Sequence, residues 1–409
     1  MKLKTNSEMK KYIVLLLAMF TLFSCKNQDE GIDNYVILVS FDAFRWDYPA
    51  LSDTPTFDKI QKEGVRAERV ISSFPTKTFP NHYSIATGLY PDNHGLVNNS
   101  FWAPDLEKFY RIGNRDMVQN PDFYGGEPIW NTAEKQGIRS ASFFWVGSEA
   151  PIQGMHPSYW KIYDGSVPFN DRVDTVLHWL QLPIEKRPGL VLLYFQEPDG
   201  VGHDFGPFGE ETGEMIRELE QELARLRDGI KDLPIADKVN LIVTSDHGMG
   251  QTSEDRYVNI YDHVKEEWVE NLAGWNPMYL LDAADDYIDS VVNILDAVEG
   301  LTAWRKEDIP AHLHYGTHER ITNVVVVADS SWSVGIEEVD SDYNGGTHGY
   351  DNSNSDMHNV FYAEGPAFKS GYKMGAFENV NIYPLITHIL DLDPAPIDGD
   401  LDIVKDMLK

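Results

Sequence analysis

Four short, predominantly apolar runs constrain the fold more than any other feature of this sequence. They are 35-YVILVSF-41, 140-SASFF-144, 190-LVLLYF-195 and 240-NLIVTS-245. A strand that is covered on both faces lacks the polar and apolar alternation of a surface strand. The runs therefore predict strands of a central, mostly parallel sheet with helices on both faces.

The stretch between the last two runs has the spacing of an amphipathic helix. Over 210–233, apolar residues recur every three or four positions, at Met215, Leu219, Leu223, Leu226 and Ile230. Strands that alternate with such helices predict an α/β fold. A second strand–helix–strand pattern, about 278–335, predicts a small α+β subdomain on one catalytic domain over 35–409.

The charge of the chain excludes some partners. Acidic residues outnumber basic ones by 65 to 34, so the 409-residue chain carries a formal charge of −31. Such a balance argues against a nucleic-acid polymer as the main partner. An anionic substrate would need a local cation, and a bound metal ion is the obvious candidate.

The N-terminus resembles a bacterial lipoprotein signal. An apolar run, 12-YIVLLLAMFTLF-23, follows two lysines and is too short to span a bilayer as a mature helix. We expect a signal peptide over 1–24, lipidation of Cys25 and a polar tether over 25–34; the alternative is an ordinary secretory signal. The protein would then be anchored to a membrane outside the cytoplasm, facing the periplasm or on the cell surface. The sequence carries no signal for oligomeric state.

Three of the apolar runs end near an aspartate, and the last two of these aspartates have a histidine close by. The aspartates are Asp42, Asp199 and Asp246. Ligands bind beyond the carboxyl ends of parallel strands, although aspartate also caps turns and helices there. The glycine-flanked segments 199-DGVGH-203, 246-DHG-248 and 345-GGTHGYDN-352 supply His203, His247 and His348. Oxygen and imidazole ligands without thiolates favour zinc, or another divalent metal.

Four blocks of the sequence occur in a specific order: 42-DAFRWDY-48, 75-PTKTFPNHYSIATGLYPDNHG-95, 197-EPDGVGH-203 and 246-DHGM-249, followed by His348. In this order they resemble the nucleotide pyrophosphatase/phosphodiesterase family of the alkaline phosphatase superfamily. The family usually has EPDSSGH where this chain has EPDGVGH, with the ligand positions kept. The resemblance implies an alkaline phosphatase-like fold and hydrolysis of nucleotide phosphodiester or pyrophosphate bonds.

The resemblance also implies two zinc ions and a threonine nucleophile. Thr78 would attack phosphorus, and a bound zinc ion could stabilise its alkoxide. The implied ligands of the first ion are Asp42, Asp246, His247 and Thr78, and those of the second are Asp199, His203 and His348. A threonyl-nucleotidyl intermediate would then be hydrolysed to a nucleoside 5′-monophosphate.

The remaining implied site residues concern the substrate. Asn99 matches the family's donor to a phosphoryl oxygen, although its sequence context alone indicates a turn. Two zinc ions, three carboxylates and one alkoxide have charges that cancel, which suits a diester with one negative charge. Tyr163 stands where related monoesterases place an arginine, which also favours diesters.

Aromatic residues imply the substrate class. Phe79 and Tyr163 match positions that sandwich a nucleobase, and Trp145 could extend that wall; core packing is the alternative for each. Small-molecule nucleotides are therefore the expected substrates. Alternatives are a phosphocholine phosphodiesterase or a monoesterase with the same metals, and a non-enzymatic nucleotide-binding lipoprotein.

Overall fold

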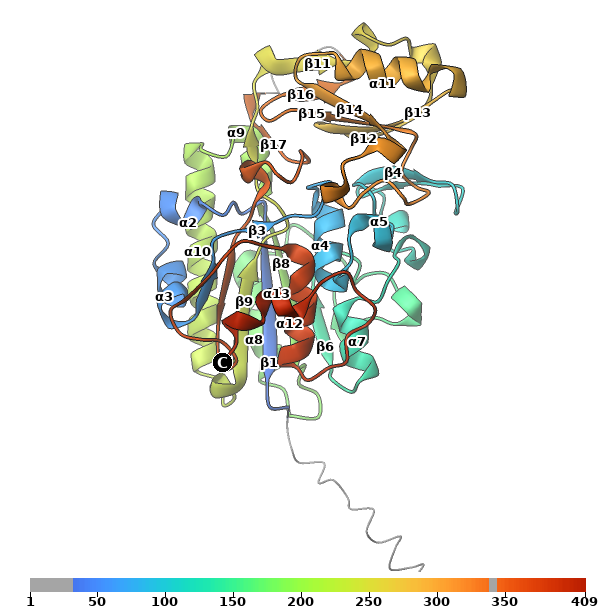
Figure 1. Cartoon of the computed structure of the whole chain (residues 1–409). Helices are drawn as coiled ribbons and strands as arrows, with labels where there is room; N and C mark the ends of the chain where they lie inside the picture. Colours follow the sequence, from blue (N-terminus) through green and yellow to red (C-terminus); the bar gives the residue numbers. More distant parts are fainter. Residues whose placement is uncertain (1–31, 338–343) are drawn as a thin grey trace, which may run out of the picture. The chain divides into compact units, whose positions relative to one another are not determined.

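A central sheet of eight strands is the main element of the computed structural model, which describes residues 32–337 and 344–409 (Figure 1). The strands in order across the sheet are β19 (Tyr372–Met374), β2 (Val65–Ala67), β18 (Phe361–Glu364), β9 (Val239–Thr244), β1 (Tyr35–Asp42), β8 (Leu190–Pro198), β6 (Ser140–Phe143) and β7 (Tyr159–Trp160). The predicted runs are β1, β6, β8 and β9. They pair in parallel, whereas β18 is antiparallel to β9. The prediction of a mostly parallel sheet is confirmed.

Helices cover both faces of this sheet (Figure 1). One group is α3 (Pro55–Glu63), α8 (Phe169–Leu180) and α10 (Glu210–Lys231), and the other is α4 (Thr78–Thr87), α7 (Ile129–Lys135) and α12 (Ile382–Ile389). All eight residues of β1 are buried, as expected for a strand between two layers. The predicted helix is α10, and its buried stripe uses Ile216 where the sequence pattern indicated Met215.

The predicted small α+β subdomain is built on a second, four-stranded sheet. Its order is β12 (Val269–Trp275), β13 (Met278–Ala283), β15 (Val324–Ala328) and β14 (Leu301–Arg305), and it packs against α11 (Ile288–Asp296) (Figure 1). The predicted strand–helix–strand elements are β13, α11 and β15. The edge strands β12 and β14 were not predicted.

Other elements are short. They are α2 (Tyr48–Leu51), α5 (Pro91–His94), α6 (Arg115–Val118), α9 (Asp199–Phe205), α13 (Leu401–Val404), and the strand pairs β3 (Val70–Ile71) with β20 (Phe377–Glu378), β4 (Ser100–Ala103) with β5 (Lys108–Arg111), β10 (Gly250–Gln251) with β17 (Gly346–Thr347), and β11 (Tyr257–Asn259) with β16 (Ser333–Gly335).

The carboxyl ends of three neighbouring strands place the predicted ligands together. β1 ends at Asp42, β8 leads directly into α9 at Asp199, and β9 is followed by Asp246. Because β1 is parallel to both neighbours, these three aspartates lie at one edge of the sheet. This is the edge at which open α/β sheets bind ligands.

The predicted signal peptide and Cys25 lie outside the described residues. In the two described ranges, no helix combines the length and the apolar character needed to cross a bilayer.

Candidate active site

Two buried aspartates and a histidine form the centre of the site. Asp42 and Asp246 are 2% and 0% exposed. The His247 Nε2 lies 3.0 Å from an oxygen of Asp246 and 3.5 Å from an oxygen of Asp42. The three side chains offer ligand atoms within 4.8 Å of one another. Such a group could hold a metal ion.

A second group lies beside the first. Asp199 Oδ1 is 3.5 Å from the Nε2 of both His203 and His348. Asp199 and His348 also have ligand atoms within 4.8 Å of one in His247, and the rings of His247 and His348 stack at 3.6 Å. The structure therefore brings all six predicted ligand residues into two adjacent groups.

Two buried carboxylate oxygens, Asp42 Oδ1 and Asp199 Oδ1, lack a hydrogen-bond donor among the described residues. The third, Asp246 Oδ2, has histidine nitrogens near it, His247 Nε2 at 3.0 Å and His82 Nδ1 at 3.2 Å. A buried carboxylate oxygen without a donor is unfavourable unless a cation or water satisfies it. Asp42 Oδ1 and Asp246 Oδ2 lie at the His247 Nε2, and Asp199 Oδ1 lies at the Nε2 of His203 and His348, so a divalent cation at each group would satisfy the oxygens there.

The three histidines are oriented as metal ligands. The Nδ1 of His203, His247 and His348 lies 2.8, 2.8 and 2.9 Å from the backbone carbonyls of Gly346, Gly248 and Thr76. A proton donated from Nδ1 leaves Nε2 with its lone pair toward the carboxylates. Backbone bonds of this kind fix the tautomer and the ring orientation of ligating histidines.

The electrostatics of the site also favour a cation. Burial raises the pKa of Asp42 well above its usual value, and the charges of Asp246 and Asp199 raise it further. Burial raises the pKa of Asp246 as well, but its contacts with His247 and His82 outweigh this and hold it well below its usual value. Burial and the neighbouring His247 keep the pKa of His348 well below its usual value. His348 is therefore neutral at pH 7 and able to coordinate.

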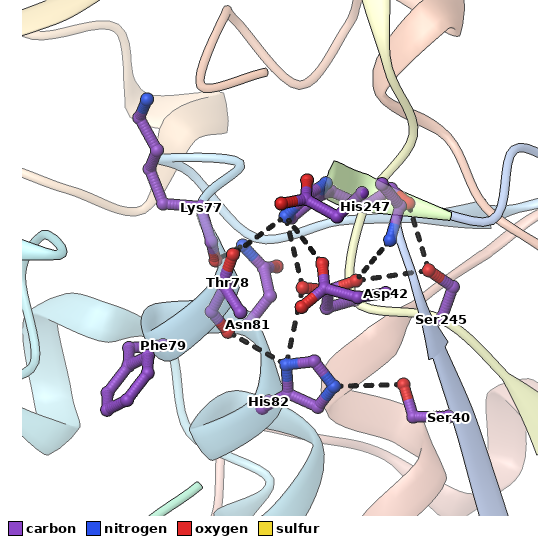
Figure 2. A network of polar contacts seen from close by, with 12 residues as sticks. Ser40, Asp42, Lys77, Thr78, Phe79, Asn81, His82, Ser245 and His247 are labelled. Atoms are coloured by element: carbon purple, nitrogen blue, oxygen red, sulfur yellow. Dashed lines mark hydrogen bonds and ion pairs between the residues drawn. The ribbon is translucent and has the colours of Figure 1, made fainter. Parts of the chain in front are cut away.

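Thr78 is the first residue of α4 and lies at the first group. Its hydroxyl oxygen is 3.2 Å from the His247 Nε2 (Figure 2). The neighbouring Thr76 has a different environment, because its hydroxyl donates to the Tyr350 carbonyl and accepts from the Gly349 backbone N–H, both at 3.0 Å. Thr76 therefore ties the loop before α4 to the His348 loop, and Thr78 is the threonine at the ligand cluster.

Asn99 and Phe79 lie next to Thr78. The backbone N–H of Phe79 donates to Asn99 Oδ1 at 3.0 Å. This bond occupies the amide oxygen and leaves the NH₂ group of Asn99 as a donor. Phe79 is half-buried and projects on the side of Thr78 away from the carboxylates (Figure 2).

Tyr163 and Trp145 differ in accessibility. Tyr163 is half-buried, with its ring against Phe144 at 5.2 Å between centroids and the Arg115 guanidinium 6.0 Å above it. Trp145 is 1% exposed, and its indole N–H donates to the His82 carbonyl at 3.0 Å. The expectation that Trp145 lines a substrate wall is wrong, because its ring is enclosed in the core beneath α4.

Two side chains that sequence reasoning missed hold the site in place. The Tyr194 hydroxyl donates to Asp42 Oδ2 at 2.6 Å. His82 Nδ1 lies 3.0 Å from the Thr78 carbonyl and 3.2 Å from Asp246 Oδ2. The position of His82 could have been inferred from the sequence, because it follows Thr78 by four residues, one helical turn away. The role of Tyr194 could not, since the sequence shows it only as one more residue in the apolar run of β8.

Comparisons with known proteins identify the family. Residues 36–351 match the family described as type I phosphodiesterase / nucleotide pyrophosphatase. The chain is 34% identical to human ectonucleotide pyrophosphatase/phosphodiesterase family member 5 over 399 residues, which cover 97% of this chain and 82% of the relative. The chain belongs to the type I phosphodiesterase / nucleotide pyrophosphatase family. It is an enzyme of that family with an alkaline phosphatase-like fold.

Other relatives of this family are longer than the chain. Human family member 1 and a venom phosphodiesterase of Crotalus durissus collilineatus are each 36% identical over 91% of this chain, which spans 42% and 46% of their lengths. One solved structure is that of an inactive threonine-to-alanine variant of murine family member 5 in complex with AMP. It matches this chain with a TM-score of 0.87 and 35% sequence identity, and the matched region covers 92% of this chain and 100% of the murine chain.

Proposed function

We propose that this protein hydrolyses phosphodiester and pyrophosphate bonds of nucleotides and releases a nucleoside 5′-monophosphate. The observation that carries the proposal is the Thr78 hydroxyl, 3.2 Å from His247 beside buried carboxylates with unpartnered oxygens. The names of the relatives, and the AMP in the inactive murine family member 5, support a nucleotide substrate.

The residues of the site fit two divalent metal ions. The first would be held by Asp42, Asp246 and His247 with Thr78, and the second by Asp199, His203 and His348. Carboxylate and imidazole donors without thiolates fit zinc. Bound there, the ions would lower the pKa of the threonine hydroxyl and stabilise charge on the leaving oxygen.

Thr78 is the proposed nucleophile. Its oxygen forms a bond to phosphorus while the bond from phosphorus to the leaving oxygen breaks, which gives a threonyl-nucleotidyl intermediate. Water then attacks the same phosphorus, and the nucleoside 5′-monophosphate leaves with the threonine hydroxyl restored. The contact of His82 with the Thr78 carbonyl, 3.0 Å, holds the first turn of α4 in place.

Asn99 and the charge of the site select a diester. The NH₂ group of Asn99 would donate to a non-bridging phosphoryl oxygen. Two divalent cations, three carboxylates and one alkoxide sum to zero charge, so a neutral amide suits a phosphoryl group with a single negative charge. A phosphomonoester dianion would require added arginine or lysine, and by sequence resemblance Tyr163 occupies the position of the arginine of related monoesterases.

Phe79 and Tyr163 would hold the nucleobase. Both rings are half-buried, which leaves part of each available for stacking. Base–aromatic stacking contributes about 1–3 kcal/mol per base with little base preference. We further propose that the enzyme works outside the cytoplasm as a lipoprotein anchored through Cys25, which the pattern of residues 1–25 supports.

Three p-nitrophenyl esters of different phosphoryl groups test the substrate class. We expect kcat/KM for the thymidylyl ester to exceed the values for p-nitrophenyl phosphate and p-nitrophenyl phosphorylcholine by at least about tenfold, since stacking on two aromatic rings favours the nucleotide. A higher kcat/KM on the phosphate ester would contradict the preference for diesters. A higher value on phosphorylcholine would assign the aromatic slot to a quaternary ammonium group.

A further inference from the structure

A cavity of about 800 Å³ lies between the candidate active site and the four-stranded sheet. His203 and His348 line its catalytic side. The opposite wall is formed by β12 and β13, and the β4–β5 pair supplies Phe109 and Arg111. Asn99 also lines the cavity, whereas Phe79 and Tyr163 do not, so the cavity extends from the phosphoryl position away from the proposed nucleobase slot.

The cavity lies on the side where a leaving group would depart. In an in-line displacement the entering and leaving oxygens lie on opposite sides of phosphorus. The entering oxygen of Thr78 lies with His247 of the first ligand group, whereas the cavity opens at His203 and His348 of the second. The leaving group of the proposed reaction is therefore directed into this cavity.

The β12–β13 hairpin is fixed against the active-site loops. Lys77 is buried, and its ammonium group donates to the Asn276 carbonyl at the hairpin turn, at 2.6 Å. The Asn276 side chain donates to Ser333 Oγ at 3.1 Å and accepts from the Val334 backbone N–H at 2.9 Å. These bonds fix the hairpin turn next to Trp275, which lines the cavity.

Trp275, the last residue of β12, is unusually accessible for a tryptophan. Its side chain is 70% exposed, the highest value among the exposed large hydrophobic residues of the described chain. Exposed aromatic rings at the rim of a site are stacking platforms for planar ligand groups. Leu272, Tyr279 and Phe109 extend the apolar wall from this ring into the cavity.

The charges of the cavity do not suit a highly anionic leaving group. The lining holds two basic residues, Lys77 and Arg111, and two acidic residues, Asp204 and Glu337. The Arg111 guanidinium lies 4.9 Å above the Phe109 ring, and Lys77 is already bonded to the hairpin turn. Free pyrophosphate, with several negative charges, would need a cluster of unpaired cations. A leaving group with one phosphate and an aromatic ring suits this lining better.

We propose that this cavity is the leaving-group subsite, that Trp275 stacks on a ring of the leaving group, and that substrates with a second nucleoside are therefore preferred to nucleoside triphosphates. The proposal rests on the proposed function, because it assigns the other half of the same substrate. Attack on a dinucleoside diphosphate breaks one phosphorus–oxygen bond, the second nucleotide departs as a monophosphate, and water releases the first.

Two substrates that share the adenylyl half but differ in the leaving group test the proposal. We expect the metal-loaded wild-type enzyme to have a higher kcat/KM for diadenosine diphosphate than for ATP. Trp275→Ala should lower the value for diadenosine diphosphate by about tenfold, the scale of one stacking contact, and leave the value for ATP within twofold. Trp275→Phe should retain most of the preference.

Tyr287→Ala is the matched control, because Tyr287 is an exposed aromatic residue next to the same sheet that does not line the cavity. It should change neither value. An equal loss on both substrates in Trp275→Ala, or no loss on either, overturns the subsite. A wild-type enzyme that hydrolyses neither adenylyl substrate would overturn the proposed function itself, whereas hydrolysis of both without a Trp275 effect overturns only the subsite.

Discussion

Thr76 lies in the loop before α4 and Thr78 is the first residue of that helix, and their surroundings differ. The Thr76 hydroxyl donates one hydrogen bond to the backbone and accepts another from it. The backbone carbonyl of Thr76 accepts a hydrogen bond from His348 Nδ1. The Thr78 hydroxyl lies at His247. Sequence could select Thr78 only through resemblance to a family, since both residues have the same chemistry. The hydrogen bonds give a physical reason to choose Thr78, because the Thr76 hydroxyl is already bonded to the backbone of the His348 loop.

Tyr194 gives a residue-scale prediction about metal affinity. Its hydroxyl is the donor to Asp42 Oδ2, so Tyr194→Phe removes a bond that orients a proposed ligand. We expect metal affinity to fall by about 10- to 100-fold, the usual cost of losing such a partner. Competition with a chromophoric chelator measures the affinity.

Tyr315→Phe is the control for that measurement. Its hydroxyl donates to the Val97 carbonyl at 2.8 Å, and the side chain is equally buried away from the carboxylates. This change should lower stability by about 1 kcal/mol without changing metal affinity. Equal metal affinity in both variants would show that the Tyr194 bond does not orient Asp42.

At the scale of helices and strands, the buried elements were the ones that could be predicted from the sequence. β1, β8, β9 and α10 were predicted because strands between two layers and helices with an apolar stripe leave a strong pattern. The edge strand β12 has mixed exposure along its length, so it leaves no such pattern. The hydrogen bonds of Tyr194 and the burial of Trp145 depend on contacts between distant segments, which one sequence does not encode in local spacing.

The contact between α4 and α5 gives a prediction about pH. His94 Nδ1 accepts from the Leu96 backbone N–H at 3.2 Å, and Nε2 lies 3.0 Å from Ser84 Oγ. Burial lowers the pKa of His94 to about 3. The unfolded chain, with an ordinary pKa near 6.5, takes up the proton first, so stability is present above that pH and is lost as pH falls. Between pH 7 and 5, His94 should lower the free energy of unfolding by about 2 kcal/mol.

Thermal or urea unfolding of the metal-free protein at the two pH values measures this loss. His94→Gln should flatten the dependence, whereas His178→Gln, at an exposed position on α8, should leave it unchanged. Burial also lowers the pKa of His318, His348 and His358, so some loss of stability should persist in the His94 variant. An unchanged slope in His94→Gln would contradict the role of this histidine.

At the scale of the whole molecule, a strongly acidic chain would bind an anionic substrate. The formal charge is −31, and three of the carboxylates meet at the candidate active site. A nucleotide diester would be repelled from such a site unless bound cations cancel the carboxylates. The carboxyl ends of the central strands would therefore supply the metal ligands, and the four-stranded sheet supplies the wall of the cavity beside them.

The turnover of Thr78→Ala, measured at full metal content on a nucleotide diester, tests the central claim most directly. The account predicts that metal content is unchanged, because six other residues supply ligands, and that kcat falls by about a thousandfold or more, as for loss of a catalytic nucleophile. Activity within tenfold of the wild-type value at equal metal content would contradict the assignment of Thr78.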